Sequence, residues 1–262
     1  MFNFFKPKPK LLVTPEDKQW IEANLKWLGS QFGQEVFRRY PVTIRSGPFS
    51  RYHNALRESM RYFLDEVAIH MELDPDDLDL HVYRHGSDER IDGPVMIVTE
   101  GSQSLGEYHH RNNLTGKFDI HLNETISKDL QVMLTTIAHE LSHVRLIGEY
   151  RHDATDEFHE YVTDLTTIYF GFGITMANTC NSRDSWTDLH GSGWSIGKRG
   201  YLPLEVVVHT LALQALQQGD REPKWAEALG KVPRRMFQQS LLWLWENEGE
   251  VPQGGRAPSD GG

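Results

Sequence analysis

Two histidines and a glutamate stand close together in the segment HELSH, residues 139–143. His139 and His143 are at positions i and i+4, so on a helix both imidazoles lie on one face and can bind the same metal ion. Zinc accepts imidazole nitrogens, and a catalytic zinc site needs three protein ligands and an open position for water. Glu140, beside the first histidine, is placed to take a proton from that water. The segment therefore predicts two zinc ligands and a general base.

A second pair of ionisable side chains follows downstream. Glu160 and Asp164 are also at positions i and i+4, and the interval from His143 is long enough for a turn and an antiparallel return of the chain. Glu160 would complete a His-His-Glu site for about one zinc ion per chain, and Asp164 would orient a ligand imidazole from behind. His152 and His159 flank this region, and either could replace Glu160. That alternative leaves the paired carboxylates unexplained.

The first motif must lie on a helix with a buried face. Its apolar residues recur at helical spacing and lie roughly opposite the two histidines on a helical wheel. They are Leu130, Leu134, Ile137, Leu141 and Val144. We therefore expect one face of this helix to pack into the core and the other to line a cleft.

The two motifs together resemble those of the gluzincin branch of the zincin metallopeptidases: His139-Glu140-x-x-His143 followed by Glu160-x-x-x-Asp164. In that branch the two histidines and the later glutamate bind zinc, the glutamate of the first motif is the general base, and the later aspartate supports a histidine. The resemblance covers residues 127–170. The metzincin pattern fails, because Leu146 and Glu149 stand where it requires glycine and histidine.

The resemblance implies a zinc-dependent hydrolase that cleaves peptide bonds in a peptide or protein substrate. Gluzincins often draw the donors that stabilise the oxyanion from late in the chain, where Tyr201 and His209 are candidates. The site chemistry alone also permits an amide or ester in a small molecule. A binding or regulatory zinc protein that keeps the zincin fold without turnover is the alternative from another class. An intact Glu140 argues against it.

The surrounding pattern changes from strands to helices along the chain. Period-two alternation and short apolar runs predict strands at residues 78–83, 95–98, 106–110 and 118–122. Helical periodicity predicts helices after Thr14 and at residues 54–71, 130–148, 153–170, 203–218 and 224–246, with an irregular loop over 178–200. This order indicates an α+β fold. The resemblance implies a zincin-like form of it, in which a small twisted mixed sheet precedes the active-site helix and a helical C-terminal half.

One catalytic domain is expected between two tails. Residues 1–10 read as a flexible basic tail and residues 248–262 as a disordered Gly- and Pro-rich tail. Between them, residues 11–125 would form a helix-and-sheet part and residues 126–247 a helical part that carries the zinc site.

Composition narrows the partners and the compartment. The chain has 262 residues and a formal net charge of −10, from 37 acidic and 27 basic residues. A surface of that sign repels phosphate backbones and anionic lipids, so neither nucleic acid nor a membrane is expected as a partner. Cys180 is the only cysteine, which excludes an internal disulfide and a thiolate zinc site. With no secretory signal pattern at the start, we expect a cytoplasmic protein. The oligomeric state stays open.

Overall fold

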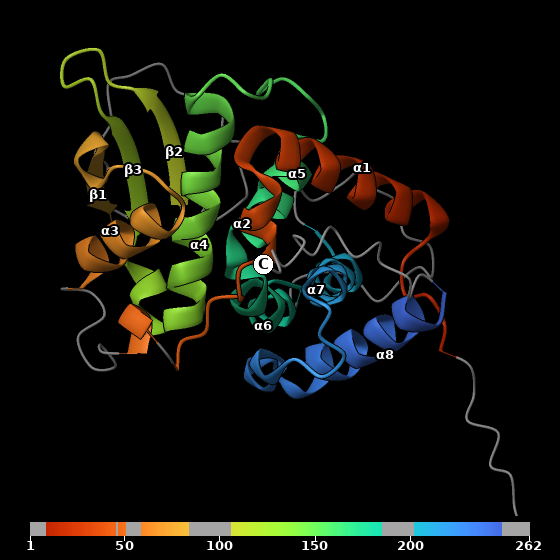
Figure 1. Ribbon diagram of the computed structural model, residues 1–262. Coiled ribbons are helices and arrows are strands. Elements are labelled where there is room, and N and C mark those ends of the chain that lie inside the picture. Colours follow the sequence, from red (N-terminus) through yellow and green to blue (C-terminus); the bar gives the residue numbers. More distant parts are fainter. Residues whose placement is uncertain (1–8, 46, 51–58, 84–105, 185–201, 248–262) are drawn as a thin grey trace, which may run out of the picture.

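A computed structural model describes residues 9–45, 47–50, 59–83, 106–184 and 202–247, although the side chains of residues 106–111 and 181–184 are not described. The predicted tails therefore fall almost entirely outside the described residues. The strand predicted at 95–98 and Tyr201 lie outside them completely. Figure 1 shows a small sheet on one side of the molecule and a group of helices on the other.

The first helix, α1 (Pro15–Phe32), begins where the sequence predicts it. Thr14 accepts a hydrogen bond from the backbone N–H of Asp17, and the Asp17 carboxylate accepts from the backbone N–H of Thr14 in return. This reciprocal pair satisfies donors that a helix start leaves free. Gly33, with φ of 88°, then turns the chain into α2 (Gln34–Arg38).

A mixed three-stranded sheet follows. Its strands are β1 (Leu78–Tyr83), β2 (Gly106–Arg111) and β3 (Phe118–Asn123), in the order β1-β3-β2. β1 runs parallel to β3, and β2 runs antiparallel to it. The strands predicted at 78–83, 106–110 and 118–122 are confirmed. The helix predicted at 54–71 is α3 (Met60–His70) in its described part.

Strand alternation gives the sheet two chemically different faces. Leu80 and Ile120 are partners in the register, and so are His81 and His121. Because successive side chains point to opposite faces, the apolar pair and the histidine pair lie on opposite sides of the sheet. β2 lies next to α4 (Leu130–His143), which places an edge of the sheet along the helix that carries the first motif (Figure 1).

The second half of the described chain is helical. After α4 come η4 (Val144–Gly148), α5 (His159–Thr167), η5 (Ile168–Phe172), α6 (Gly173–Asp184), α7 (Leu204–Gln218), η6 (Lys224–Ala228) and α8 (Lys231–Asn247). α4 packs against α5 and α6, while α7 packs between α6 and α8 (Figure 1). The described part thus mixes helices with a small sheet, in agreement with the α+β class.

Three boundaries were predicted wrongly. The helix expected at 224–246 is divided into η6 and α8, and the other two errors lie at Asp153 and at residue 178. Asp153 does not cap a long helix: it accepts hydrogen bonds from Thr155 in a local turn, and α5 begins only at His159. Residues 178–184, expected in an irregular loop, extend α6. The chain kinks at Gly171, whose φ is 99°, and helix α6 then begins at Gly173.

The buried apolar side chains form one continuous cluster from Val13 to Leu244, which includes residues of the sheet and of the helices. None of the helices in the described ranges is long and apolar enough to cross a membrane.

Candidate metal centre

Helix α4 brings the two histidines of the first motif together. Its start is fixed by Asp129, whose carboxylate accepts from the backbone N–H groups of Gln131 and Val132. One turn of helix separates His139 from His143, and their Nε2 atoms lie 3.2 Å apart. The i, i+4 spacing therefore produces the shared face that the sequence predicts.

The face of α4 that carries the first motif is largely buried. His139, Glu140 and His143 are 6%, 5% and 8% exposed, so the polar side of α4 is nearly as buried as its apolar side. α5 packs along α4 and contributes to this burial. A helical wheel separates the polar from the apolar face of a helix, but it does not say what packs on the polar face, so this burial could not be predicted from the sequence.

α5 supplies the third group. The Glu160 Oε2 atom lies 3.3 Å from His139 Nε2 and 3.7 Å from His143 Nε2. The three side chains offer ligand atoms that all lie within 4.8 Å of one another, and they could hold a metal ion. The Glu160 side chain is 44% exposed while the two imidazoles are 8% and 10% exposed, so the group is accessible from the Glu160 side.

Asp164 lies directly behind the first histidine. Its Oδ1 atom accepts from His139 Nδ1 at 2.9 Å, and its Oδ2 atom accepts from the backbone N–H of Leu202 at 2.8 Å. Asp164 is 2% exposed, so both bonds form away from water. A carboxylate on Nδ1 keeps the proton there and leaves the lone pair of Nε2 for the ligand group.

His159 lies behind the second histidine, a placement the sequence did not predict. Its Nε2 atom is 3.1 Å from His143 Nδ1, and it is 7% exposed. From the sequence, His152 and His159 were considered only as replacements for Glu160. In the structure His152 stacks on His159, with ring centroids 5.7 Å apart. The available signal was the position of His159 immediately before Glu160.

The carboxylates set the charge of the group. Burial disfavours a positive charge on His139, but its hydrogen bonds to Asp164 and Glu160 and the nearby Glu140 outweigh burial and raise its pKa well above the usual value. Burial lowers the pKa of His143 well below the usual value, and the positive charge on His139 lowers it further. Burial alone would raise the pKa of Glu160, but its hydrogen bond to His139 and the adjacent imidazoles lower it to about 2. The surroundings of His139 therefore stabilise one positive charge, which a cation can supply in place of a proton.

The spacing of the ligand atoms fits zinc. In a tetrahedral site with zinc bonds of about 2.0–2.1 Å, two ligand atoms lie about 3.3–3.4 Å apart. The three measured separations are 3.2, 3.3 and 3.7 Å. Two imidazole nitrogens and one carboxylate oxygen are also a donor set that zinc accepts in catalytic sites.

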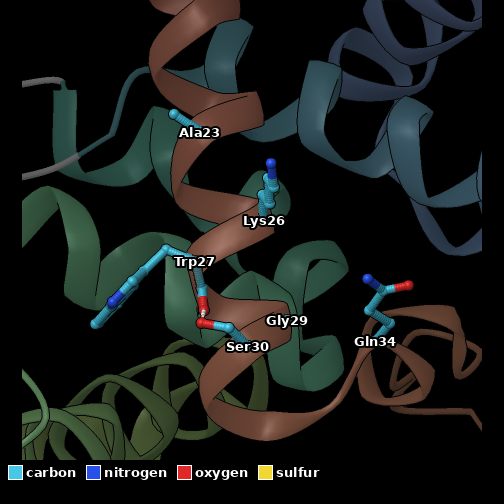
Figure 2. Close-up of a pocket in the computed structure, with 6 residues that line it drawn as sticks. All are labelled: Ala23, Lys26, Trp27, Gly29, Ser30 and Gln34. Atoms are coloured by element: carbon cyan, nitrogen blue, oxygen red, sulfur yellow. Dashed lines mark hydrogen bonds between the residues drawn. The ribbon is translucent and has the colours of Figure 1, made fainter.

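The other candidates lie apart from this group or outside the described residues. The Nδ1 atom of His209 is 2.7 Å from the hydroxyl of Ser240 on α8, and burial lowers its pKa to about 4. Cys180, the single cysteine, is buried, and Tyr201 lies outside the described residues. A hollow of about 390 Å³ on α1 is lined by Ala23, Lys26, Trp27, Gly29, Ser30 and Gln34, none of them a candidate ligand (Figure 2).

The chain was compared with models of known protein families, with curated proteins and with solved structures, and none of them matches.

Proposed function

We propose that the protein is a zinc-dependent hydrolase that cleaves peptide bonds. The observation that carries the proposal is the convergence of His139, His143 and Glu160 from two helices, with ligand atoms within 4.8 Å of one another. The motif that supplies the two histidines also supplies Glu140 as a base. Thiolate ligands are excluded as an alternative donor set, because the sequence has a single cysteine.

Each side chain has a separate role in this proposal. His139, His143 and Glu160 hold the ion, and Asp164 keeps His139 in the tautomer that offers Nε2. When bound, zinc lowers the pKa of a water molecule to about 7 and polarises the carbonyl that the water attacks. Glu140 accepts the proton from that water and passes it to the leaving amine, first as general base and then as general acid.

A peptide substrate suits the sheet edge beside α4. Among the described strands β2 pairs only with β3, so its other edge is the one that an extended chain would join. β2 also contacts α4 and η4, so a peptide paired along it would run close to the first motif. Main-chain hydrogen bonds to a sheet edge hold extended peptides with little dependence on their sequence.

The proposal is tested in two steps. Elemental analysis after purification without chelators should find about one zinc ion per chain. A peptide library is then digested with the zinc-loaded wild type and with Glu140→Gln, which keeps the ligands and removes the base. Glu157→Gln, an exposed glutamate close to α5, is the matched control and should cleave like the wild type. If the zinc-loaded wild type cuts nothing that Glu140→Gln leaves intact, the hydrolase proposal is wrong.

A second candidate is a zinc-binding protein without turnover. The burial of His139, Glu140 and His143, all less than a tenth exposed, favours it, because a catalytic site must admit its substrate. It predicts stoichiometric zinc without cleavage in the same library digest. Zinc content and cleavage together therefore separate the two candidates.

A further inference from the structure

The two ligand histidines are supported by different chemical groups on the side away from the ligand atoms. The His139 Nδ1 atom faces the Asp164 carboxylate at 2.9 Å, whereas the His143 Nδ1 atom faces the imidazole of His159 at 3.1 Å. The first partner is an anion and the second is a neutral ring that can either donate or accept. The role of His159 therefore depends on where its single proton sits.

The geometry of His143 decides that question once a metal ion is bound. The Nε2 atom of His143 points toward His139 Nε2 and Glu160 Oε2. A bond from this Nε2 atom to a metal ion uses its lone pair, so the proton of the neutral His143 ring must be on Nδ1. That proton is then donated to His159 Nε2, so His159 must carry its own proton on Nδ1. The opposite tautomer of His159 would donate to His143 Nδ1, push the His143 proton to Nε2 and block the metal bond.

Thr163 is not an equal substitute for His159. Its hydroxyl donates to the backbone carbonyl of His159 at 3.0 Å, so it meets His143 Nδ1 only as an acceptor and at 3.5 Å. A contact at that distance is at the limit of a hydrogen bond. The stronger acceptor for the His143 proton is therefore His159.

The His159 ring is held from its other side. It is 7% exposed and stacks on His152 with ring planes 20° apart, and His152 in turn lies 5.9 Å from the ring of Trp27 on α1. Figure 2 shows the Trp27 side chain extending from α1 on the side away from Gln34. The His159 Nδ1 atom has no hydrogen-bond partner among the described residues. Packing rather than a second hydrogen bond thus orients the ring. The His159 Nε2 atom lies 3.1 Å from His143 Nδ1 and, at the longer distance of 3.9 Å, from Glu160 Oε1.

We propose that His159 is a positioning residue for zinc: it accepts the Nδ1 proton of His143 and thereby holds His143 in the tautomer that binds the ion. This inference rests on the metal site of the proposed function. A neutral acceptor also avoids adding another carboxylate to a group that already contains Asp164, Glu160 and Glu140 close to His139. The expected contribution is about 10–100-fold in zinc affinity, the usual effect of a partner behind a metal ligand.

Two substitutions separate the hydrogen bond from the packing. His159→Leu keeps an apolar side chain in the buried position but has no acceptor, whereas His159→Gln restores an acceptor oxygen at about the reach of Nε2. Zinc affinity, measured by competition with a chromophoric chelator, should fall about 10–100-fold in His159→Leu and recover to within a few-fold of wild type in His159→Gln. Unchanged affinity in His159→Leu, or equal losses in both variants, would overturn the inference.

A measurement on the wild type removes any dependence on how the variants fold. The ¹⁵N chemical shifts of the zinc-loaded protein report which ring nitrogen carries the proton. We expect His159 protonated at Nδ1 and His143 protonated at Nδ1; a proton on His159 Nε2 contradicts the inference. Wild-type protein that takes up no zinc would refute the proposed function itself, whereas a zinc-binding wild type with an insensitive His159 refutes only this step.

Discussion

Replacement of Asp164 by Asn should leave one of two N–H donors without its acceptor. Asp164 accepts from His139 Nδ1 with one oxygen and from the backbone N–H of Leu202 with the other. An Asn side chain has only one acceptor oxygen, so its NH₂ group must face one of these two N–H groups. If the NH₂ group faces His139, the His139 proton is driven to Nε2, which removes a zinc ligand. If it faces Leu202, a buried backbone N–H loses its partner.

The magnitude follows from the burial of this contact. Asp164 is 2% exposed, so water cannot replace the lost acceptor. If the NH₂ group faces His139, we expect zinc affinity to fall by about 10–100-fold, or about 1.4–2.8 kcal/mol. If it faces Leu202, the free energy of unfolding of the metal-free protein should fall by about 1–3 kcal/mol, the usual cost of an unsatisfied buried donor.

Chelator competition measures the first quantity and urea unfolding of the metal-free protein the second. Glu157→Gln, an exposed acid-to-amide change, is the control and should alter neither. The reasoning about two donors is refuted if Asp164→Asn matches the wild type in both measurements. A loss of stability with unchanged zinc affinity would limit the role of Asp164 to the contact with Leu202.

Three further predictions concern the ligands, the bound ion and acid stability. Glu140→Gln should abolish peptide cleavage while its zinc content stays at that of the wild type. Glu160→Gln should lose more zinc affinity than a substitution of a residue behind a ligand, such as Asp164, does. If cleavage assays and elemental analysis show the reverse pattern, the roles of Glu140 and Glu160 are exchanged. Zinc at 100 times its Kd should raise the free energy of unfolding by about 2.7 kcal/mol, and a urea midpoint that does not move with zinc contradicts binding to the folded state. Burial lowers the pKa of His209 to about 4, below its value of about 6.5 in an unfolded chain, so this residue costs no stability above pH 6.5 and removes stability as the pH falls towards 4. About 2 kcal/mol of that loss should be present at pH 5, and His209→Gln should show a correspondingly smaller drop between pH 7 and pH 5 in urea unfolding.

Several helices and strands could be predicted from the sequence because their signals come from residues that are close together in the chain. The Thr14 cap and the proline that follows it define the start of α1, since both act within one turn. Strict alternation of apolar and polar residues at 118–122 identified β3, because the period of two in a strand is likewise a property of neighbouring residues. The i, i+4 spacing of His139 and His143 is likewise a property of one helix, so a helix prediction was enough to place both imidazoles on one face.

Errors arose where local signals compete. Asp153 has the right side chain for a helix cap, but the same carboxylate can close a turn on Thr155, and here it does. The helix predicted at 153–170 ends just before Gly171, yet helical structure continues on both sides of this residue, whose positive φ only redirects the chain. Whether the chain stops or kinks there depends on neighbours that are distant in sequence.

The sequence by itself determined which residue types stand at which spacing: a pair of histidines with a glutamate between them, and a later pair of carboxylates. Only the tertiary structure decided that α5 returns along α4, so that Glu160 Oε2 comes within 3.3 Å of His139 Nε2 and Asp164 lies behind the same ring. It also decided that the polar face of α4 is buried and that His159 supports His143. The physical reason is that spacing within one helix is fixed by backbone hydrogen bonds, whereas contacts between helices depend on how all their side chains pack together.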